Sequence, residues 1–280
     1  IGSDVGHHCY SGTFDGKGFA IWGLFCNNTN DDSVGLFGNV TGGTVKNVDI
    51  CASYFHSNGH AGSIAGAISE KSTIENCHVL CDADINGDYK YAGLICGWNC
   101  ESTIKNCIAS GYVTATGTQA CAGGICGCNN NGLIENCCYS DSSGIFPDYY
   151  SNVQGSITAK GNQACAGGIC GLNCYNGKIT NCYNTRTVSC SDEGYAGGIC
   201  GWNNENGEVS NCYSTGDISG DKFGGVCGLI EGYGPEYIQN CYFLKAEGLN
   251  GTGSGDTNAV INEMTDEQFA SGEVCWLLNS

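Results

Sequence analysis

The sequence predicts an all-β fold: a parallel β-helix, or β-solenoid, of about seven triangular rungs of 30 residues each. A phrase of the form Ala-Gly-Gly-Ile-Cys-Gly recurs along the chain, with clear copies at residues 122–127, 166–171 and 196–201. An Asn-Cys step follows the closing glycine of most copies by nine to twelve residues. A fixed period between about 20 and 50 residues is typical of stacked units that cannot bury their apolar faces alone.

Each unit contains short runs of strand-forming residues separated by glycine and asparagine. In the copy around Gly171, these runs are residues 166–170, 178–183 and 185–189. They are rich in Ile, Val, Thr, Tyr and Cys, which favour strands, whereas glycine and asparagine favour corners with left-handed backbone angles. Three strands and three corners predict one triangular rung, and rungs stacked about 4.8 Å apart form parallel sheets.

Comparison of the copies indicates which side chains point inward. The residue after the corner asparagine is Val48 in the first copy and cysteine in the six others. The residue before the closing glycine is Phe37, then Ala65, then cysteine in five copies. Since apolar residues replace these cysteines, we expect both positions to lie in the core. Intervening polar residues such as Lys46 and Glu75 should face outward, as strand alternation requires.

The chain divides into a solenoid over residues 1–243, with an N-terminal edge segment at 1–33, and a C-terminal linker and cap over 244–280. Thr265 and Gln268 have the spacing of a capping box, which predicts that a short helix begins there. The residues that follow supply apolar side chains that we expect to cover the last rung: Phe269, Val274, Trp276, Leu277 and Leu278.

One insertion, at residues 144–155, interrupts the repeat. It lengthens the spacing between corner asparagines from 29 or 30 residues to 45 and has no counterpart in the other copies. The inserted loop gathers apolar residues of the kind that anchor interfaces: Ile145, Phe146, Pro147, Tyr149 and Tyr150. We therefore predict that it is an interaction loop for a partner. The alternative is that it folds back over a groove of its own coil.

Cysteine usage predicts disulfide bonds and an extracellular or cell-surface location. The chain holds 23 cysteines in 280 residues, a density near that of disulfide scaffolds, which occur in oxidising compartments. The odd total leaves at least one thiol free or bonded to another chain. The alternatives are a ladder of buried free thiols that pack as small hydrophobic residues, or a metal site. Metal ligands must converge on one point, whereas these cysteine positions alternate between the two sides of a strand. We therefore expect no metal and no cofactor.

Two disulfide patterns are open. The cysteine of the repeated phrase and the cysteine after the corner asparagine are present together in five copies, which favours a bond within one rung: Cys96–Cys107, Cys126–Cys137, Cys170–Cys182, Cys200–Cys212 and Cys227–Cys241. The rival pattern joins equivalent positions of neighbouring rungs, which lie about 4.8 Å apart. The candidates for this rival pattern are Cys51 with Cys81 and Cys121 with Cys165. Cys9 and Cys26 flank the opening segment and form one more candidate pair.

Charge and hydropathy argue against two classes of partner. Ten basic against 28 acidic residues give a net charge of −18, so nucleic acid, which binds basic surfaces, is not an expected partner. No run of about 18 apolar residues occurs, so no membrane span is expected. The sequence begins at Ile1 without a signal peptide, so we expect any targeting segment to have been removed or to lie outside this sequence.

Residues with catalytic potential are few. The His7-His8 pair could bind a metal, but no acidic cluster has matching spacing. Asp82 with Asp84, and Asp217 with Asp221, are carboxylate pairs of the kind that sugar-cleaving enzymes use. Other rungs carry Thr, Ser or Gly at the equivalent positions, so we expect no stacked acidic patch. We therefore predict no catalytic residues and no enzyme activity.

Aromatic residues recur at two places in the repeat. Tyrosine stands beside the Asn-Cys step at Tyr139, Tyr183, Tyr213 and Tyr242. Tryptophan follows the closing glycine at Trp98 and Trp202. They are interpreted either as corner packing or as an aromatic face that stacks on sugars or on a protein partner.

The opening, repeated and closing segments together resemble a known family. Tyr10-Ser-Gly-Thr-Phe-Asp-Gly16 is followed by Ile21-Trp-Gly-Leu24 and Val34-Gly-Leu-Phe-Gly38. Later copies contain Gly-Gly-Ile-Cys-Gly and Asn-Cys-Tyr-Ser-Thr-Gly, and the array closes on Met264-Thr-Asp-Glu-Gln-Phe-Ala-Ser-Gly272. In these features the chain resembles GLUG-repeat proteins, which are bacterial cell-surface, adhesin-like and peptidase-associated proteins. The resemblance implies a scaffold fold over nearly the whole chain and transfers no catalytic residues.

These observations predict an extracellular, non-catalytic structural or adhesive surface module, a rigid disulfide-stapled solenoid with a protein or a glycan as its surface partner. One alternative is a protomer of a self-assembling extracellular filament, because a solenoid exposes unpaired strand edges at both ends. A second alternative is a carbohydrate-binding or carbohydrate-active β-helix. A glycan-binding screen would distinguish this second alternative from the other two functions. Light scattering of the purified chain would identify a filament.

Overall fold

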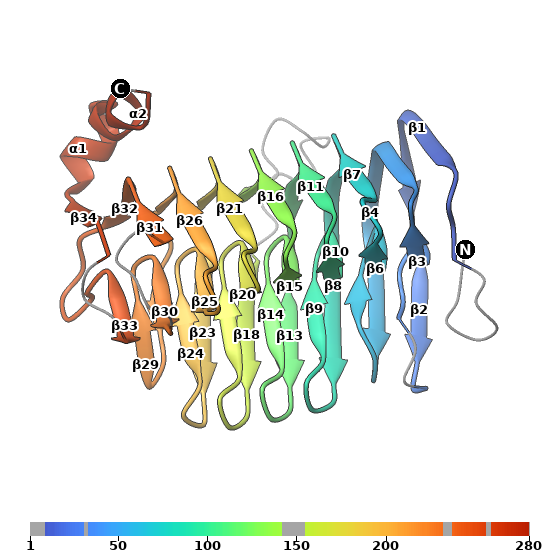
Figure 1. Ribbon diagram of the computed structural model, residues 1–280, viewed down its shortest axis with the longest axis horizontal. Helices are drawn as coiled ribbons and strands as arrows, with labels where there is room; N and C mark the ends of the chain where they lie inside the picture. The colour runs from blue at the N-terminus through green and yellow to red at the C-terminus, as the bar shows by residue number, and fades with distance from the viewer. Residues whose placement is uncertain (1–8, 31–32, 142–154, 232–236, 256–258, 280) are drawn as a thin grey trace.

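The chain winds through successive rungs along one axis and forms a parallel β-solenoid (Figure 1). The fold is taken from a computed structural model that describes residues 9–30, 33–141, 155–231, 237–255 and 259–279. The first strands lie at one end of the rod and two short helices at the other. The predicted fold class, a solenoid of about seven turns with a short helical C-terminus, is confirmed.

One sheet has eight strands, and successive turns of the coil contribute one strand each. It contains β3 (Phe37–Thr41), β6 (Ala65–Ser69), β10 (Cys96–Cys100), β15 (Cys126–Asn130), β20 (Cys170–Cys174), β25 (Cys200–Asn203), β30 (Cys227–Ile230) and β33 (Thr252–Gly255). A six-stranded sheet precedes it in the six rungs from β6 to β30. That sheet contains β5 (Ala61–Gly62), β9 (Tyr91–Gly93), β14 (Cys121–Gly123), β19 (Cys165–Gly167), β24 (Tyr195–Gly197) and β29 (Lys222–Gly224).

The third sheet has 20 strands, because most rungs contribute two or three strands to it. Its N-terminal half contains β1 (Thr13–Trp22), β2 (Phe25–Asn28), β4 (Thr44–Ser57), β7 (Thr73–Glu75), β8 (His78–Asn86), β11 (Thr103–Lys105), β12 (Ile108–Ser110), β13 (Val113–Thr116), β16 (Leu133–Glu135) and β17 (Cys138–Tyr139). Its C-terminal half contains β18 (Ser156–Lys160), β21 (Lys178–Thr180), β22 (Tyr183–Asn184), β23 (Thr187–Ser191), β26 (Glu208–Ser210), β27 (Tyr213–Ser214), β28 (Ile218–Ser219), β31 (Ile238–Gln239), β32 (Cys241–Leu244) and β34 (Ile261–Met264). Both halves pair in parallel from rung to rung, as the repeat predicts.

A single rung contains more strands than the sequence predicts. The rung that spans residues 165–191 runs through β19, β20, β21, β22 and β23, whereas the repeat predicts three strands. The predicted run 166–170 is divided because the chain turns at Gly168, where an added Cβ would overlap the carbonyl oxygen of Gly198 in the next rung. The predicted run 178–183 is divided at the corner residue Asn181.

Asparagine forms the same corner in seven successive rungs of the 20-stranded sheet. The corner residues have left-handed φ angles between 50° and 55°: Asn47, Asn76, Asn106, Asn136, Asn181, Asn211 and Asn240. Asparagine tolerates this conformation better than most residues because its short polar side chain can hydrogen-bond locally. The corner role predicted from the repeat is confirmed.

The core is a narrow column inside the coil. Both positions predicted to point inward are buried, as Phe37, Val48 and the cysteines that replace them show. The polar residues between them remain partly exposed, and some pair across rungs, such as Lys105 Nζ with Glu75 Oε2 at 3.0 Å. Strand alternation therefore separates an apolar interior from a polar outer surface, as predicted.

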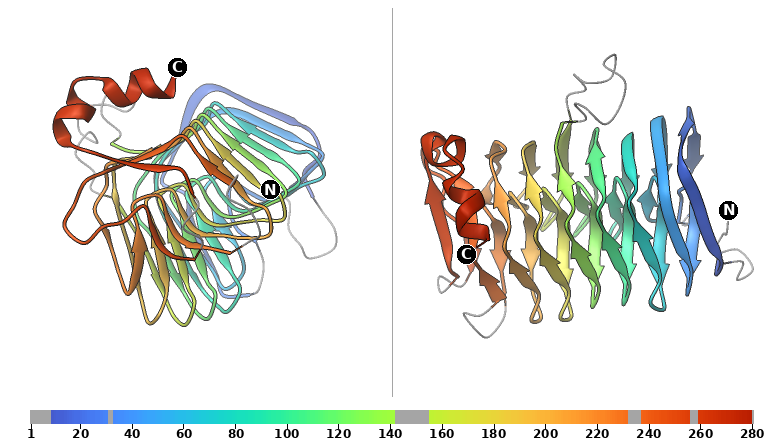
Figure 2. Two further views of the ribbon diagram at one scale, coloured as in Figure 1. Left: turned by 60° about the vertical axis from the view of Figure 1, so that its left-hand side comes forward. Right: turned by 90° about the horizontal axis from the view of Figure 1, so that it is seen from above.

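Two helices end the chain, α1 (Asp266–Ala270) and α2 (Glu273–Leu278). The predicted capping box is present, because Thr265 accepts from the backbone of Gln268 and the side chain of Gln268 accepts from the backbone of Thr265. Val274 packs with Tyr242 and Met264, so the helices cover outward-facing side chains of the last rungs (Figure 2). Trp276, expected to join this packing, is 69% exposed. In the described ranges, no helix is long and apolar enough to cross a membrane.

Candidate functional site

The cysteines of the repeated phrase form one row along the eight-stranded sheet. The pairing of neighbouring strands places five of them in register: Cys96, Cys126, Cys170, Cys200 and Cys227. All five are fully buried. Register partners on adjacent parallel strands lie about 4.8 Å apart, so each thiol lies beside the equivalent thiol of the next rung.

The cysteines after the corner asparagines form a second row: Cys77, Cys107, Cys137, Cys182, Cys212 and Cys241. The thiol of Cys182 contacts those of Cys137 and Cys212 in the neighbouring rungs. Burial raises the pKa of the Cys182 and Cys212 thiols well above its ordinary value. These side chains are therefore neutral thiols at neutral pH, and they pack as small hydrophobic residues.

The disulfides predicted from cysteine usage are not formed in the structure, where all 23 cysteines are free thiols. The thiol of Cys126 contacts Cys96 and Cys170 in the neighbouring rungs. This is the arrangement of the rival, rung-to-rung pattern. Which cysteines pair under oxidising conditions stays a prediction.

The expected equivalence of Cys51 and Cys81 is wrong. Cys51 aligns with Leu80, and Cys81 aligns with Ser53. The register of β4 shifts between these positions because Ala52, with a φ of 48°, forms a bulge. A one-residue insertion of this kind cannot be read from a repeat that contains a single example of it.

The other two candidate pairs differ in their geometry. Cys121 and Cys165 are register partners on β14 and β19, as expected, and both are buried. Cys26 lies on β2 of the 20-stranded sheet, whereas Cys9 precedes Tyr10, which bridges to the eight-stranded sheet. Cys9 and Cys26 therefore belong to different sides of the first rung.

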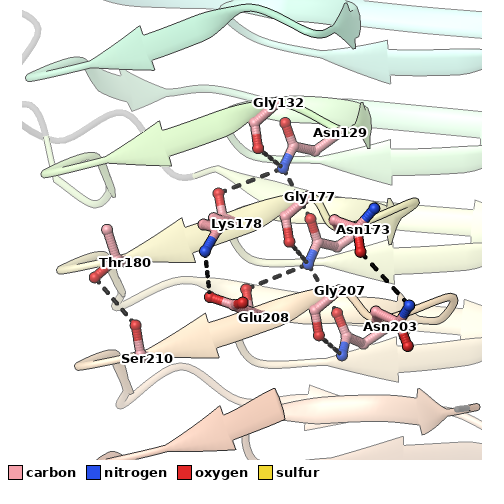
Figure 3. A network of polar contacts seen from close by, with 12 residues as sticks. Asn129, Gly132, Asn173, Gly177, Lys178, Thr180, Asn203, Gly207, Glu208 and Ser210 are labelled. Atoms are coloured by element: carbon pink, nitrogen blue, oxygen red, sulfur yellow. Dashed lines mark hydrogen bonds and ion pairs between the residues drawn. The ribbon is translucent and has the colours of Figure 1, made fainter. Parts of the chain in front are cut away.

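A row of buried asparagines, which was not predicted from the sequence, crosses the eight-stranded sheet. Asn99, Asn129, Asn173 and Asn203 are at most 2% exposed. The Nδ2 of each of the first three donates to the Oδ1 of the next asparagine, at 2.7, 2.8 and 2.8 Å in chain order. Figure 3 shows the row from Asn129 to Asn203. Each Nδ2 also donates to a carbonyl oxygen of the adjoining turn, on Ser102, Gly132, Gly177 and Gly207 respectively.

This buried row fixes the turn that follows each strand of the eight-stranded sheet. A buried amide without a hydrogen bond costs about 1–3 kcal/mol, so the row is stable only when its members are consecutive. It begins after Ile68, which aligns with Asn99, and ends before Ile230, which aligns with Asn203. The signal in the sequence is a Cys-x-x-Asn spacing in four successive copies.

A hollow of about 290 Å³ opens on the outer surface beside the β4 bulge. Ala52, Ser53, Tyr54, Asp82 and Gly111 contribute to its lining. The backbone of Gly111 has a φ of 128°, and an added Cβ there would overlap the carbonyl oxygen of Cys81. The bulge and this glycine together leave space for a small ligand.

The two aspartates beside the hollow lie in different environments. Asp84 Oδ1 accepts from the Tyr54 hydroxyl at 3.0 Å and lies 2.8 Å from His56 Nδ1. Asp82 accepts from the backbone N–H of Tyr112 at 3.0 Å. Burial raises the pKa of Asp82, and the charge of Asp84 raises it further. Two carboxyl groups with unlike environments can divide the roles of acid and base, or bind the hydroxyl groups of a ligand.

The remaining candidates are placed as follows. Asp221 accepts from the backbone N–H of Glu193, so it belongs to a turn. His78 Nδ1 lies 3.0 Å from Asp49 Oδ1 on the neighbouring strand. His7, His8 and the interaction-loop residues 145–150 lie outside the described residues. Within the described ranges, no group of three or more His, Cys, Asp or Glu side chains is arranged to hold a metal ion.

The recurring aromatic residues serve different purposes in successive rungs. Tyr139 is fully buried, and its hydroxyl donates to the carbonyl oxygen of Gly111 at 2.6 Å. Tyr183 and Tyr213 are half-buried on the outer surface, with their rings stacked 5.0 Å apart. Trp202 packs with Tyr195 in a small cluster between the six- and eight-stranded sheets. Corner packing and an aromatic surface are therefore both present.

Comparison with known proteins supports the fold. A solved structure named IgA1 protease superposes with a TM-score of 0.60 at 18% sequence identity, over 92% of this chain and 20% of that chain. The chain thus spans only a fifth of that protein. A second structure, from Bacteroides ovatus and proposed to be an immunoglobulin A1 protease, has a TM-score of 0.46 at 18% identity, over 94% of this chain and 72% of that chain. At this identity, the likeness concerns the fold alone.

The sequence comparisons match a smaller part of the chain than the structural comparisons do. No curated protein matches the chain. The family described as the GLUG motif matches residues 162–189 and 192–219, which are two consecutive rungs. The chain is therefore a parallel β-solenoid that carries GLUG motifs, as its resemblance to GLUG-repeat proteins predicts.

Proposed function

We propose that the chain is a non-catalytic structural or adhesive module of an extracellular surface. The observation that carries this proposal is the continuity of its buried rows: cysteines join successive rungs from Cys77 to Cys241, and asparagines join those from Asn99 to Asn203. Such a column resists bending and holds its outer surface in a fixed shape. A rigid rod with a polar, acidic exterior is suited to presenting a binding surface away from a cell.

The proposed partner is a protein or a glycan that contacts the outer surface. The binding test uses the full chain on an array of glycans and extracellular proteins. Released reducing ends and newly cleaved peptide bonds, including those of immunoglobulin A1, are measured in parallel. We expect retention of a partner without turnover. Turnover of any bound partner would contradict the non-catalytic proposal.

The hollow beside Asp82 and Asp84 favours a second candidate function, a carbohydrate-active β-helix. Its support is the raised pKa of Asp82 beside the hydrogen-bonded Asp84. If this function holds, the purified chain releases reducing ends from a polysaccharide and Asp82→Asn abolishes the release. Asp217→Asn, an exposed aspartate on another rung, serves as the matched control.

Self-association into a filament is the third candidate. Strands β1 and β2 pair with β4 on their inner side and carry exposed aromatic residues, with Phe19 and Phe25 each 74% exposed. An apolar strand edge of this kind pairs readily with another chain. Light scattering over a concentration series tests it, with Phe19→Ser as the variant expected to reduce any association.

A further inference from the structure

The corner asparagines line a pocket of about 320 Å³ next to helix α2. The solenoid side of the pocket is formed by Asn136, Asn181 and Asn211 with Tyr183 and Tyr213. Leu278 and Asn279, at the end of α2, form the opposite side. The pocket therefore lies where the C-terminal segment crosses the outer surface of the coil.

The row of corner amides changes its hydrogen bonding inside this pocket. In the first four rungs each amide donates to the preceding one, and the last of these bonds joins Asn136 Nδ2 to Asn106 Oδ1 at 3.2 Å. The next link is interrupted: Asn181 Oδ1 accepts from Thr180 Oγ1 at 3.5 Å, and in the described ranges Asn181 Nδ2 has no protein acceptor. The row resumes where Asn240 donates to Asn211 at 2.7 Å. The interruption leaves a carboxamide available to a ligand.

The tyrosines of the pocket are held in place before any ligand binds. The rings of Tyr183 and Tyr213 stack at 5.0 Å with an interplanar angle of 2°. Phe269 of α1 packs on Tyr213 with ring centroids 5.8 Å apart. Burial raises the pKa of both tyrosines, so their hydroxyls stay neutral. A rigid wall of this kind lowers the entropy cost of binding.

We propose that this pocket binds a neutral saccharide, which gives the adhesive function proposed above its ligand class and rests on that function. The polar lining side chains are amides and phenols, which both donate to and accept from hydroxyl groups. Among the described residues, no carboxylate or ammonium group lines the pocket to balance a charged ligand, and the net charge of −18 disfavours anions. Tyrosine adds an apolar ring on which the C–H groups of a sugar pack.

The test compares two corner asparagines that share one backbone conformation. The full chain is applied to an array of neutral and charged oligosaccharides, and the neutral ligand it retains is titrated by calorimetry. Asn181→Gly removes the carboxamide inside the pocket and keeps the left-handed corner, whose φ is 55°. Asn76→Gly is the matched control, because Asn76 has a φ of 53°, lies outside the pocket, and in the corner row bonds to Asn47 and Asn106, neither of which lines it. Circular dichroism melting confirms that both variants fold.

We expect Asn181→Gly to weaken binding by about fivefold to tenfold, the value of one neutral hydrogen bond, and Asn76→Gly to leave it unchanged. Asn279→Ala, on the helix side, should weaken binding by a similar factor. If the wild-type chain retains no neutral saccharide, or if both glycine variants bind it equally well, the pocket assignment is overturned. Equal binding by the variants leaves the adhesive proposal standing, whereas cleavage of the saccharide contradicts that proposal instead.

Discussion

The free energy lost when a buried asparagine of the row is replaced should depend on its position in the row, even between asparagines that are equally buried. Asn173, an internal member, accepts from Asn129 at 2.8 Å and donates to Asn203 at 2.8 Å and to the carbonyl oxygen of Gly177 at 3.0 Å. Its Nδ2 has only two hydrogens, so the longer contact with the carbonyl oxygen of Glu208, at 3.3 Å, shares one of them. Asn99, the first member, donates twice, but its own Oδ1 has no partner among the described residues. The two side chains are equally buried, at 0% exposure.

Replacement of each residue by alanine therefore removes the same volume but a different number of hydrogen bonds. At about 1 kcal/mol net for each bond, Asn173→Ala should cost about 3 kcal/mol and Asn99→Ala about 2 kcal/mol, beyond the shared cavity cost. The midpoint and slope of urea unfolding measure the difference, because an unchanged slope reports a change in stability alone. Equal costs for the two variants would refute the claim that the row acts as a connected network.

Three further predictions follow from the packing and the thiols. Deletion of residues 262–280 should lower the melting temperature and promote self-association in light scattering, because it uncovers the aromatic side chains under the helices; an unchanged monomer would show that the helices are not a cap. Iodoacetamide at pH 8 should label the exposed Cys275 well before the buried Cys51, because burial raises the pKa of Cys51 to about 12 and leaves about one thiolate in ten thousand; equal labelling rates would contradict this. After oxidation with a disulfide reagent, non-reducing peptide mapping should link Cys121 to Cys165, the register partners; recovery of within-rung pairs would establish the other pattern.

Side-chain burial and corners that repeat could be predicted from the sequence, whereas the point at which a run divides into two strands, and a bulge that occurs once, could not. The inward cysteines and the left-handed asparagine corners follow from comparing copies, since each copy samples the same environment. The division of the predicted run 166–170 at Gly168 was missed because a tight turn and a strand both tolerate the Gly-Gly pair. The bulge at Ala52 has no second example in the chain, so no comparison could reveal it.

The candidate sites depend on contacts between side chains of different rungs, and only some of these contacts could be predicted from the sequence. The repeated Cys-x-x-Asn spacing is the signal for the row of buried asparagines. It was not recognised because asparagine at a strand end is usually assigned to a turn. The hollow beside Asp82 requires the β4 bulge to bring Tyr54 and Asp84 together. Glycan binding was among the predicted alternatives, whereas the pocket beneath α2 depends on where the C-terminal helices pack.

The stacking of the rungs also determines how the rod responds to force. Its two ends lie at opposite extremes of the long axis (Figure 1), so tension between them pulls on one rung at a time. Each rung that detaches releases about 30 residues, or about 100 Å of extended chain. The outer rungs, which lie outside the hydrogen-bonded asparagine row, should detach first, and the rungs from Asn99 to Asn203 last. The solenoid would then extend stepwise under load while its central rungs stay intact, which would dissipate a sudden pull on an attached surface.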